Sequence, residues 1–283
     1  MNTKTFDFTI IGGDMRQVWL TKLLAQDGKH ICHYGLCAPL SEPNAKPAAS
    51  LAEAISSSPV LIAPIPFSKL INIASFSELA QAIPSGHILF GGCIPESFLK
   101  LISFKKISVF DFMDSPSFSF WNAKATAEAA IANAILLSPQ TLFESNCLIL
   151  GYGKCAKALS YLLSLSCCTL TVAARNSNQL AEASLVASQT LSLNSLSNYD
   201  LSSFDFIFNT IPAPVLDSNH LKEISHSALL LDLASAPGGF KVEEANALGR
   251  NAHILPGLPG KYSPLSSAQK MLAFIFKQLK ISV

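Results

Sequence analysis

The stretch LGYGKCA at residues 150–156 has the glycine spacing of a phosphate-binding turn. Gly151, Gly153 and Ala156 follow the order GxGxxA, after an apolar run and at the start of a segment with helical periodicity. The first glycine allows a sharp turn, the second leaves room for a pyrophosphate, and the small third residue lets the helix pack on its strand. N–H groups at the start of such a helix attract phosphate. We therefore predict that a dinucleotide contacts Gly151, Tyr152, Gly153, Lys154, Cys155 and Ala156.

The end of the next apolar segment, VAARNSN at residues 172–178, bears on the kind of dinucleotide. Sites for NAD usually carry an acidic residue about 20 residues after the glycines, bonded to the ribose 2′-hydroxyl. This stretch has no acid, whereas Arg175 can pair with a 2′-phosphate through two hydrogen bonds. NADP is therefore the expected cofactor, with Asn176 beside Arg175. An ordinary solvated arginine at a strand end is the alternative interpretation.

A second glycine turn, IIGGDMRQ at residues 10–17, lacks the spacing of the dinucleotide motif. It still places a helix N-terminus and an arginine at the end of an apolar run. Such a turn can hold a carboxylate as well as a phosphate. We therefore predict that Gly12, Gly13 and Arg16 help to bind the substrate. The alternative is a plain strand-to-helix corner in which Asp14 caps the helix.

Three further apolar segments end in polar, glycine or proline residues, at positions 209–212, 232–239 and 256–262. In open α/β sheets, ligands bind beyond the carboxyl ends of the strands. These ends therefore predict the edge that faces the nicotinamide and the substrate, with Asn209 and Thr210 assigned to the cofactor. For any single residue, a tight turn built by proline or glycine is the alternative.

The elements that must position these residues alternate along the chain. Strand-like runs are predicted at residues 6–11, 30–36, 59–66, 87–95, 105–113, 146–153, 168–175, 204–212, 226–235 and near 252. Helix-like runs follow both glycine turns and recur at residues 75–83, 121–137, 178–188 and 265–280. The proline- and serine-rich residues 38–50 are expected to form a loop. The alternation predicts an α/β fold with two Rossmann-like, doubly wound parallel-sheet domains joined by a long helix.

The same pattern predicts the domain organisation. The parts are an N-terminal α/β substrate-side domain at 1–120, a bridging helix at 121–140, an NADP-binding domain at 141–263 and a C-terminal helix at 264–283. The bridging segment is rich in alanine and free of glycine and proline up to Ser138-Pro139. The C-terminal helix is expected to return to the N-terminal domain. A chain of 283 residues is long enough for two such cores.

Composition argues against several classes of protein. The formal net charge is +1, so no basic field is available to attract nucleic acid. Seven cysteines at scattered positions, without CxxC spacing, predict reduced thiols and no metal site. The sequence shows neither a signal-peptide pattern nor an apolar run of about 18 residues, so we expect a cytoplasmic protein without a membrane span.

Several motifs together resemble those of the A subunits of dipicolinate synthase from spore-forming bacteria. The shared motifs are IIGGDMRQ, ATAE at 125–128, LGYGKCAKAL, VAARN, FNTIPAPVL, LLLDLASAPGG and LPGLPGKYSP, in this order. The first motif and the PGLPGK loop are more specific than the Rossmann turn, which many dehydrogenases share. The resemblance covers nearly the whole chain.

This resemblance implies an NADP-dependent oxidoreductase in the mother cell of a sporulating bacterium, working with a separate B subunit. The substrate would be dihydrodipicolinate, formed from 4-hydroxy-tetrahydrodipicolinate, and the product pyridine-2,6-dicarboxylate. Two carboxylates need cationic or N–H-rich holders, for which we select the Gly12–Gly13 turn, Arg16, Ser235 and Lys261. Lys261 and Glu128 are also the candidate catalytic groups. For Glu128, an exposed helix carboxylate is the alternative.

Two other classes of function stay open at this stage. Another two-domain NADP dehydrogenase, of the shikimate or 2-hydroxyacid type, would share the cofactor turn. A non-catalytic NADP-binding subunit would need no proton acceptor, and no residue of the sequence stands out as one. The sequence leaves the oligomeric state open, with a homodimer as one option.

Overall fold

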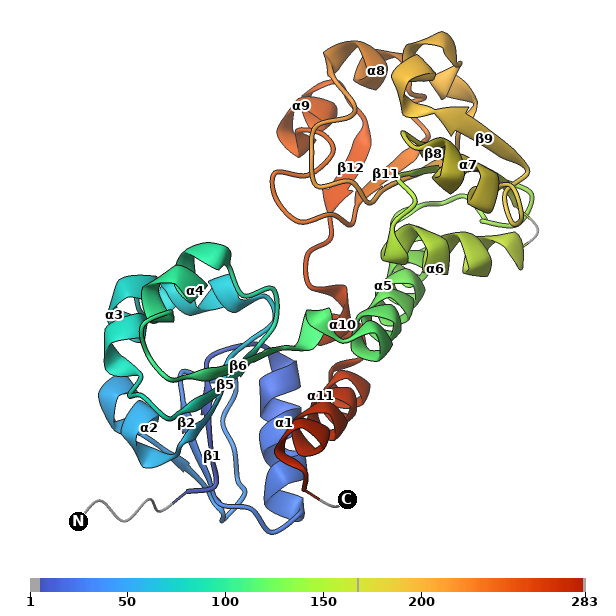
Figure 1. The fold of residues 1–283 in the computed structure, drawn as a ribbon. Helices are drawn as coiled ribbons and strands as arrows, with labels where there is room; N and C mark the ends of the chain where they lie inside the picture. The colour runs from blue at the N-terminus through green and yellow to red at the C-terminus, as the bar shows by residue number, and fades with distance from the viewer. Residues whose placement is uncertain (1–5, 167, 282–283) are drawn as a thin grey trace. The chain divides into compact units, whose positions relative to one another are not determined.

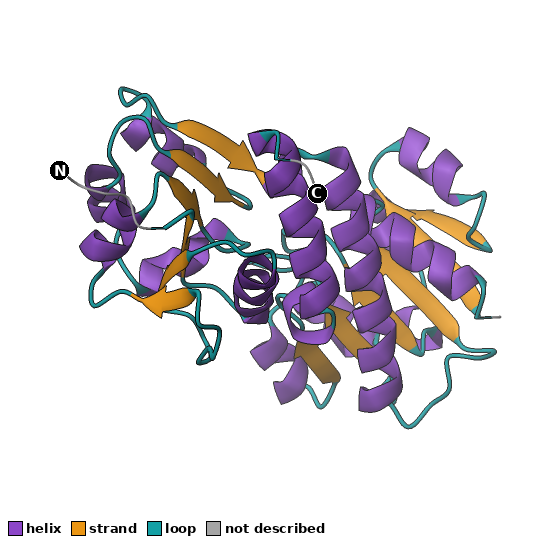
Figure 2. Cartoon of the chain, turned by 90° about the horizontal axis from the view of Figure 1, so that it is seen from below, coloured by secondary structure: helices purple, strands orange, loops and turns teal. Residues whose placement is uncertain are grey.

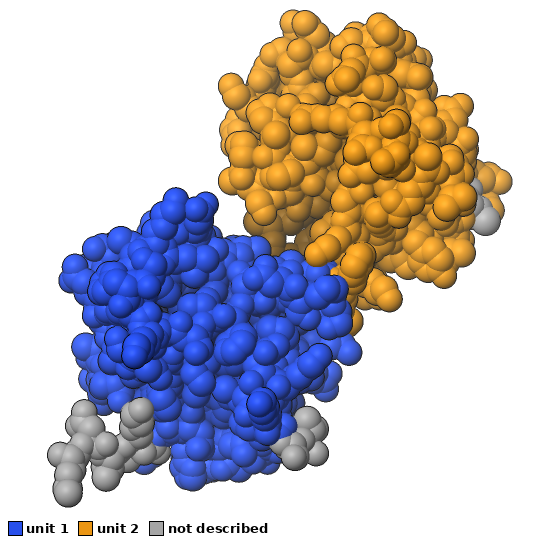
Figure 3. Space-filling view, in the orientation of Figure 1, with its two compact units in different colours: residues 1–119, 260–283 blue, residues 120–259 orange. Residues whose placement is uncertain are grey.

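The computed structural model describes residues 6–166 and 168–281. The chain forms two compact units, coloured separately in Figure 3. Unit 1 comprises Met1–Ser119 and Gly260–Val283, and unit 2 comprises Phe120–Pro259. The divisions fall inside two helices, α5 (Pro116–Leu137) and α10 (Leu258–Tyr262). The chain therefore leaves unit 1 once and returns to it once.

The described residues of unit 1 contain a six-stranded parallel sheet (Figure 1). Its strands are β1 (Phe8–Ile11), β2 (Ile31–Tyr34), β3 (Ala45–Pro47), β4 (Val60–Ile62), β5 (Ile88–Gly91) and β6 (Ser108–Asp111). Its helical segments are α1 (Met15–Gln26), α2 (Leu51–Ser57), η1 (Phe67–Asn72), α3 (Phe76–Ala82), α4 (Glu96–Ile102), η2 (Phe112–Asp114) and α11 (Pro264–Leu279). The strand order is β3-β2-β1-β4-β5-β6. Because this order reverses between β1 and β4, the carboxyl ends of these two strands form a switch point, where open α/β sheets bind ligands.

Helices cover both faces of the unit 1 sheet, as Figure 2 shows. On one face, Leu20 and Leu24 of α1 share a core with Met271 and Ile275 of α11, and the two helices lie side by side in Figure 1. Side chains of η1, α3 and α4 form the core of the other face. Strands buried on both faces need continuous apolar sequences, which explains why β1 and β4 lack strict alternation.

Local capping signals set the starts of two helices in unit 1. Asp14 caps α1, and the Gln17 side chain accepts a hydrogen bond from the backbone N–H of Asp14. Ser75 and Glu78 form the same reciprocal arrangement at α3. These capping boxes satisfy N–H groups that the helix itself leaves without acceptors.

The described residues of unit 2 repeat the architecture with a second six-stranded parallel sheet. Its strands are β7 (Asn146–Leu150), β8 (Thr169–Ala174), β9 (Gln189–Ser192), β10 (Phe206–Asn209), β11 (Leu229–Asp232) and β12 (Asn251–Ile254). Besides α5 and α10, its helical segments are α6 (Lys154–Ser164), α7 (Ser177–Ala183), η3 (Leu193–Asn198), η4 (Leu201–Ser203), α8 (Ser218–Glu223) and α9 (Val242–Ala247). The order β12-β11-β10-β7-β8-β9 places the switch point between β7 and β10. The predicted fold class, two doubly wound parallel-sheet domains, is confirmed.

The structure differs from the sequence expectation in several local segments. Strand β3 lies inside residues 38–50, where a loop is expected; it is a three-residue strand at a sheet edge, which permits its Pro47. Helix α5 begins at Pro116 instead of residue 121, because proline fits the first turn of a helix. The helix expected at 178–188 ends at Ala183. The expected loop at 256–262 contains the short helix α10. The expectation also lacks β9 and the short helices α2, α4, α8 and α9.

Candidate functional site

The glycine turn after β7 has the backbone that its sequence requires. Gly151 has a φ of +98°, a region open mainly to glycine, and a Cβ there would lie 2.6 Å from the hydroxyl oxygen of Thr210. Gly153 caps α6, and no other residue lies within 4 Å of the position that its Cβ would take. The protein's own packing therefore explains the first glycine, whereas the second leaves open space in front of a helix N-terminus.

This open space belongs to a pocket of about 250 Å³ at the β7/β10 switch point. The pocket is lined by Gly151, Tyr152, Gly153, Ala174, Arg175, Gln179, Leu193, Thr210, Ile211 and Pro212. The first N–H groups of α6 have no acceptor within their own helix, and together with the helix dipole they favour an anion. The pocket thus combines an anion-binding end with a mainly apolar lining.

The other side chains of the LGYGKCA motif serve the packing of unit 2. Ala156 is fully buried between α6 and the sheet, as the motif predicts for its third small position. Tyr152 is buried, with the Lys157 ammonium 5.6 Å from its ring centre. Lys154 lies over the ring of Phe120. Burial raises the pKa of the Cys155 thiol, which therefore stays neutral at physiological pH.

The end of β8 carries the residues that the sequence assigns to the 2′-position of the ribose. Arg175 is exposed and lines the pocket. Asn176 caps α7, because its side-chain oxygen accepts a hydrogen bond from the Asn178 N–H at 2.8 Å. Glu182, the acid on the following helix, pairs with Lys157 at 2.7 Å. Arg175 is thus an available cation at this rim, while Asn176 organises the helix beside it.

The ends of β10 and β11 are tied together by a buried polar pair. The fully buried Asn209 donates from Nδ2 to Asp232 at 2.8 Å, and Asp232 accepts the Gly239 N–H at 2.7 Å. A Cβ on Gly239 would lie 2.3 Å from the Asn209 amide. The Asn209 side chain therefore holds the 232–239 loop, while Thr210 packs against Gly151 and lines the pocket. Ser235 is exposed in this loop.

Unit 1 carries a charged cluster at its own switch point. Arg16 donates from Nε and Nη2 to the two oxygens of Asp14 at 2.9 and 2.8 Å. Its Nη2 also donates to the carbonyl of Ile65, which follows β4. Lys69 of η1 donates to Asp14 Oδ2 at 2.7 Å. The residues after β1 and those after β4 are thus joined through the carboxylate of Asp14. We name Asp14, Arg16 and Lys69 the Asp14 cluster.

The charges of the Asp14 cluster do not cancel. Burial alone would raise the pKa of Asp14, but hydrogen bonds from Arg16 and Lys69 and the Arg16 charge outweigh it and lower the pKa to about 2. Asp14 is therefore ionised at physiological pH beside two cations. The cluster carries a net charge of +1 and favours an additional anion.

The glycines of this turn are more crowded than those of unit 2. Gly12 and Gly13 have φ values of +62° and +102°. A Cβ on Gly13 would lie 2.3 Å from the Gln17 side-chain oxygen. A Cβ on Gly260 would lie 2.4 Å from Asp14, so the PGLPGK loop contacts the cluster directly. The exposed Lys261 is its neighbour in sequence.

Two residues of the site carry no functional motif of their own in the sequence, and one predicted residue, Glu128, does not line the pocket of unit 2. Lys69 follows β4 and meets Asp14 across 55 positions of sequence, so only the strand order joins them. Asp232 was noted only as part of a strand end. Glu128 is exposed on α5 and has no hydrogen bond or ion pair within the described residues.

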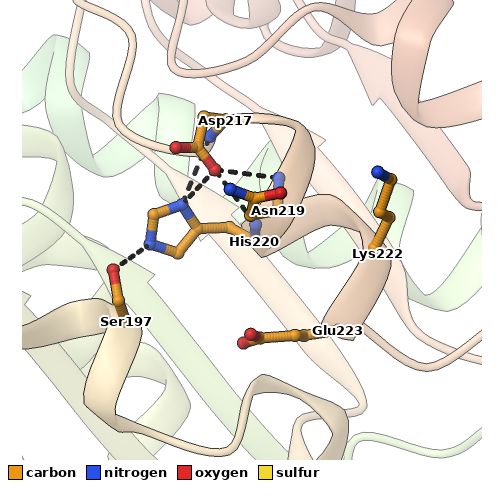
Figure 4. A pocket seen from close by; sticks show the side chains of 6 residues that line it. All are labelled: Ser197, Asp217, Asn219, His220, Lys222 and Glu223. Carbon is orange, nitrogen blue, oxygen red and sulfur yellow. Dashed lines mark hydrogen bonds and ion pairs between the residues drawn. The ribbon is translucent and has the colours of Figure 1, made fainter.

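A second pocket, of about 470 Å³, carries serine, histidine and aspartate in contact (Figure 4). The Ser197 hydroxyl lies 3.0 Å from His220 Nε2, and His220 Nδ1 lies 2.8 Å from Asp217. Asp217 also accepts the N–H groups of Asn219 and His220 as the cap of α8, and the hydrogen bond from the His220 backbone lowers its pKa. The aspartate of a serine nucleophile site is buried. Asp217 is 66% exposed, so we interpret this arrangement as a helix cap.

The described residues show neither a metal-binding cluster nor a membrane-spanning helix. In residues 6–166 and 168–281, no group of three or more histidine, cysteine, aspartate or glutamate residues is arranged to hold a metal ion. Over the same ranges, no helix has both the length and the apolar character needed to cross a membrane.

Comparison with solved structures identifies proteins that share the fold of this chain. D-lactate dehydrogenase from Lactobacillus jensenii, solved with NAD⁺, superimposes with a TM-score of 0.60 at 10% identity, over 95% of this chain and 94% of that one. At this identity the similarity concerns the fold. The chain has a two-domain, Rossmann-like α/β fold, which the D-lactate dehydrogenase shares.

Closer matches are found among dipicolinate synthase A subunits. Residues 7–113 match the family model of the N-terminal domain of the dipicolinate synthase A subunit. The A subunit of dipicolinate synthase from Bacillus subtilis (strain 168) is 27% identical over 197 residues, which are 69% of this chain and 65% of that protein, just under two thirds of its length. The crystal structure of the corresponding A subunit from Bacillus halodurans is 23% identical with a TM-score of 0.80, over 96% of this chain and 97% of that one. The chain is thus similar to dipicolinate synthase A subunits in its N-terminal domain model, in sequence and in fold, in agreement with the resemblance that its motifs carry.

Proposed function

We propose that the chain is an NADP-dependent oxidoreductase that converts dihydrodipicolinate, formed from 4-hydroxy-tetrahydrodipicolinate, to pyridine-2,6-dicarboxylate during sporulation. A separate B subunit is its proposed partner. The observation that carries the proposal is the pocket at the β7/β10 switch point, where Gly153 leaves open space before a helix N-terminus and Arg175 lies at the rim. Similarity to dipicolinate synthase A subunits supports the choice of substrate.

The residues of this pocket fit a nicotinamide dinucleotide. The first N–H groups of α6 are placed to hold the pyrophosphate, and the missing side chain of Gly153 allows it to approach. Arg175 is suited to bind a 2′-phosphate with two hydrogen bonds, as an acidic residue would not. When bound, the cofactor supplies the capacity to accept a hydride. Leu193, Ile211 and Pro212 give the pocket an apolar wall.

The Asp14 cluster supports the binding of an anionic substrate by unit 1. Its net positive charge and the positive-φ turn at Gly12 and Gly13 favour a carboxylate. Arg16 contributes charge and positions Asp14. Gly260 lies against Asp14, and Lys261 is the next residue of the chain. Lys261 is therefore our candidate for binding the second carboxylate of the substrate or for proton transfer.

Unit 2 contributes two further candidate residues for the reaction, Ser235 and Glu128. Ser235 is exposed in the loop that Asn209 and Asp232 hold, and we propose that it donates to a substrate oxygen. Glu128 is an exposed carboxylate on α5 and is our candidate proton acceptor. Substituting Glu128 by Gln should lower kcat with little change in NADP affinity if this role is correct.

The test is the formation of NADPH by the purified chain from NADP and enzymatically generated dihydrodipicolinate, with and without a B subunit. NADPH and pyridine-2,6-dicarboxylate formed by the chain alone would support the proposal in full. Formation only with the B subunit would mean that the active site needs assembly. NADP binding without hydride transfer in either case would favour a non-catalytic NADP-binding subunit.

Cofactor choice can be tested separately by changing Arg175. Arg175→Ala removes the charged partner of the 2′-phosphate, so the Kd for NADP should rise by about ten- to a hundredfold while the Kd for NAD changes little. Lys222→Ala, an exposed cation at the second pocket, is the matched control and should leave both constants unchanged. An equal loss of affinity for NADP and NAD would contradict the assignment of the 2′-phosphate.

A further inference from the structure

Gln17 holds a buried hydrogen-bond donor without an acceptor. The residue is fully buried in the first turn of α1, and its Oε1 accepts the Asp14 N–H at 3.0 Å. Its Nε2 has no hydrogen-bond partner among the residues that the structure describes. Buried polar groups in native proteins are nearly always paired, so an orphan donor calls for an explanation. An acceptor that comes from a ligand would supply one.

The position of the Gln17 amide relates this donor to the first glycine turn. The amide lies so close to Gly13 that a Cβ on Gly13 would be 2.3 Å from Oε1 and 2.4 Å from the amide carbon. The donor therefore adjoins the turn after β1, at the β1/β4 switch point where sheets of this order bind ligands.

Lys69 provides a cation on the same carboxylate, from the other side of the switch point. Asp14 already accepts four hydrogen bonds: from the backbone N–H and Nε of Arg16 at Oδ1, and from Arg16 Nη2 and Lys69 Nζ at Oδ2. Its acceptor capacity is therefore filled. An ammonium group has three donors, and one of those of Lys69 is used by Asp14. The Lys69 side chain is 36% exposed, so its other donors are accessible.

The thiols of Cys37 and Cys93 interact electrostatically with residues of the Asp14 cluster. Burial raises the pKa of the Cys37 and Cys93 thiols, which therefore add no negative charge at physiological pH. Asp111, the acid near Cys93, accepts the N–H groups of Cys93, Ile94 and Met113. Among the described residues, Arg16 and Lys69 form ion pairs with no carboxylate other than that of Asp14.

We propose that Gln17 Nε2 and Lys69 Nζ bind one carboxylate group of the substrate. Lys69 supplies the charge, Gln17 supplies a fixed neutral donor, and Arg16 acts as a positioning residue that holds Asp14 and, through it, Lys69. The assignment rests on the proposed function for the identity of the substrate. The site itself selects a planar carboxylate that can accept hydrogen bonds from both residues.

The experiment is a calorimetric titration of the full chain, loaded with NADP, with pyridine-2,6-dicarboxylate and, in parallel, with glutarate. Lys69→Met removes the charge and keeps the length of the side chain. Gln17→Glu keeps the oxygen that caps Asp14 and replaces the orphan donor with an anionic oxygen. Each change should raise the Kd for the dicarboxylate at least tenfold, because a charge-assisted hydrogen bond is lost. Lys69→Arg should recover part of the affinity.

Controls separate binding from folding. Lys100→Met removes an exposed cation of α4 in the same unit and should leave the Kd unchanged. The Kd for NADP and the unfolding temperature should stay close to the wild-type values in Lys69→Met, which shows that the fold persists. If Gln17→Glu is unstable, Lys69→Met and Lys69→Arg decide the question.

The outcomes distinguish this inference from the proposed function. If the wild type binds pyridine-2,6-dicarboxylate and Lys69→Met binds it equally well, the inference is wrong while the proposed function stands. If the wild type binds only glutarate and the variants lose that binding, the carboxylate site is supported while the proposed substrate is wrong. If the wild type binds neither compound, both are wrong.

Discussion

The two units share one strand order and place a glycine turn at the same switch point, yet the two turns differ in what they leave open. In unit 2, nothing approaches the position of a Cβ on Gly153, and a pocket of about 250 Å³ lies beyond it. In unit 1, Gly13 abuts Gln17 and the turn contains the Asp14 cluster. The shared topology supplies an edge of the kind where ligands bind in open α/β sheets. We propose that the residues at each turn select the ligand, a dinucleotide in unit 2 and a carboxylate in unit 1.

The largest expected effect concerns the buried pair of unit 1. Asp14→Ala leaves the Arg16 guanidinium, only 3% exposed, without its carboxylate, and should lower the free energy of unfolding by about 3–5 kcal/mol. Glu96→Ala breaks an exposed pair with Lys100 and should change it by only about 0.5 kcal/mol. Urea denaturation of both variants measures the difference. Similar small losses in both would show that the Asp14 cluster does not hold the turn of unit 1.

The open turn of unit 2 should respond in the opposite way. Gly153→Ala meets no neighbouring atom, so the free energy of unfolding should change by less than about 1 kcal/mol. The added methyl group occupies space proposed for a pyrophosphate, so the Kd for NADP should rise by about ten- to a hundredfold. Thermal unfolding and NADP titration test the two effects. Unaltered NADP affinity would exclude this turn from the cofactor site.

Acid should weaken unit 1 through Asp14. Its pKa is lowered from an ordinary value of 3.8 to about 2, so its contribution to stability is fully present above about pH 4 and is lost as the pH falls through 2. The shift corresponds to about 2 kcal/mol. The difference in unfolding free energy between the wild type and Asp14→Asn should shrink by about that amount between pH 5 and pH 2. Since other carboxylates titrate in both proteins, a constant difference would argue against the lowered pKa.

The smallest effect is expected at the exposed Ser197–His220–Asp217 arrangement. Asp217→Ala removes the cap of α8 and should lower the free energy of unfolding by about 1 kcal/mol. Ser197→Ala removes a surface contact and should change it by less than about 0.5 kcal/mol. Chemical denaturation gives both values, and labelling of Ser197 by a fluorophosphonate would contradict the interpretation of this arrangement as a helix cap.

Signals that act over a few residues made much of the fold predictable. The strand-glycine-helix order at 146–164 predicts the turn after β7, because Gly151 must take a positive φ that other residues avoid. Ser75 and Glu78 likewise indicate the start of α3 before any tertiary contact is known. Strand β3 was not predictable in this way, since three residues at an edge owe their conformation to pairing with β2. Pro116 was a usable signal for the start of α5.

The candidate site was predictable only in part, for reasons visible in single residues. Arg175 follows β8 directly, so its place at the pocket rim follows from local sequence. Asn209 also ends a strand, but its amide turns to Asp232, and no local pattern encodes that choice. Lys69 lies in a 3₁₀ segment after β4 and shows no motif of its own.

The sequence by itself determined the class of fold and the glycine turn of unit 2, because apolar periodicity, glycine positions and caps act between neighbouring residues. The tertiary structure alone decided which distant residues share a carboxylate. Arg16 and Lys69 meet at Asp14 because β1 and β4 are adjacent strands, and that adjacency arises from burying both faces of the sheet. The net positive charge of the Asp14 cluster and the unpaired Nε2 donor of Gln17 are therefore properties of the folded unit.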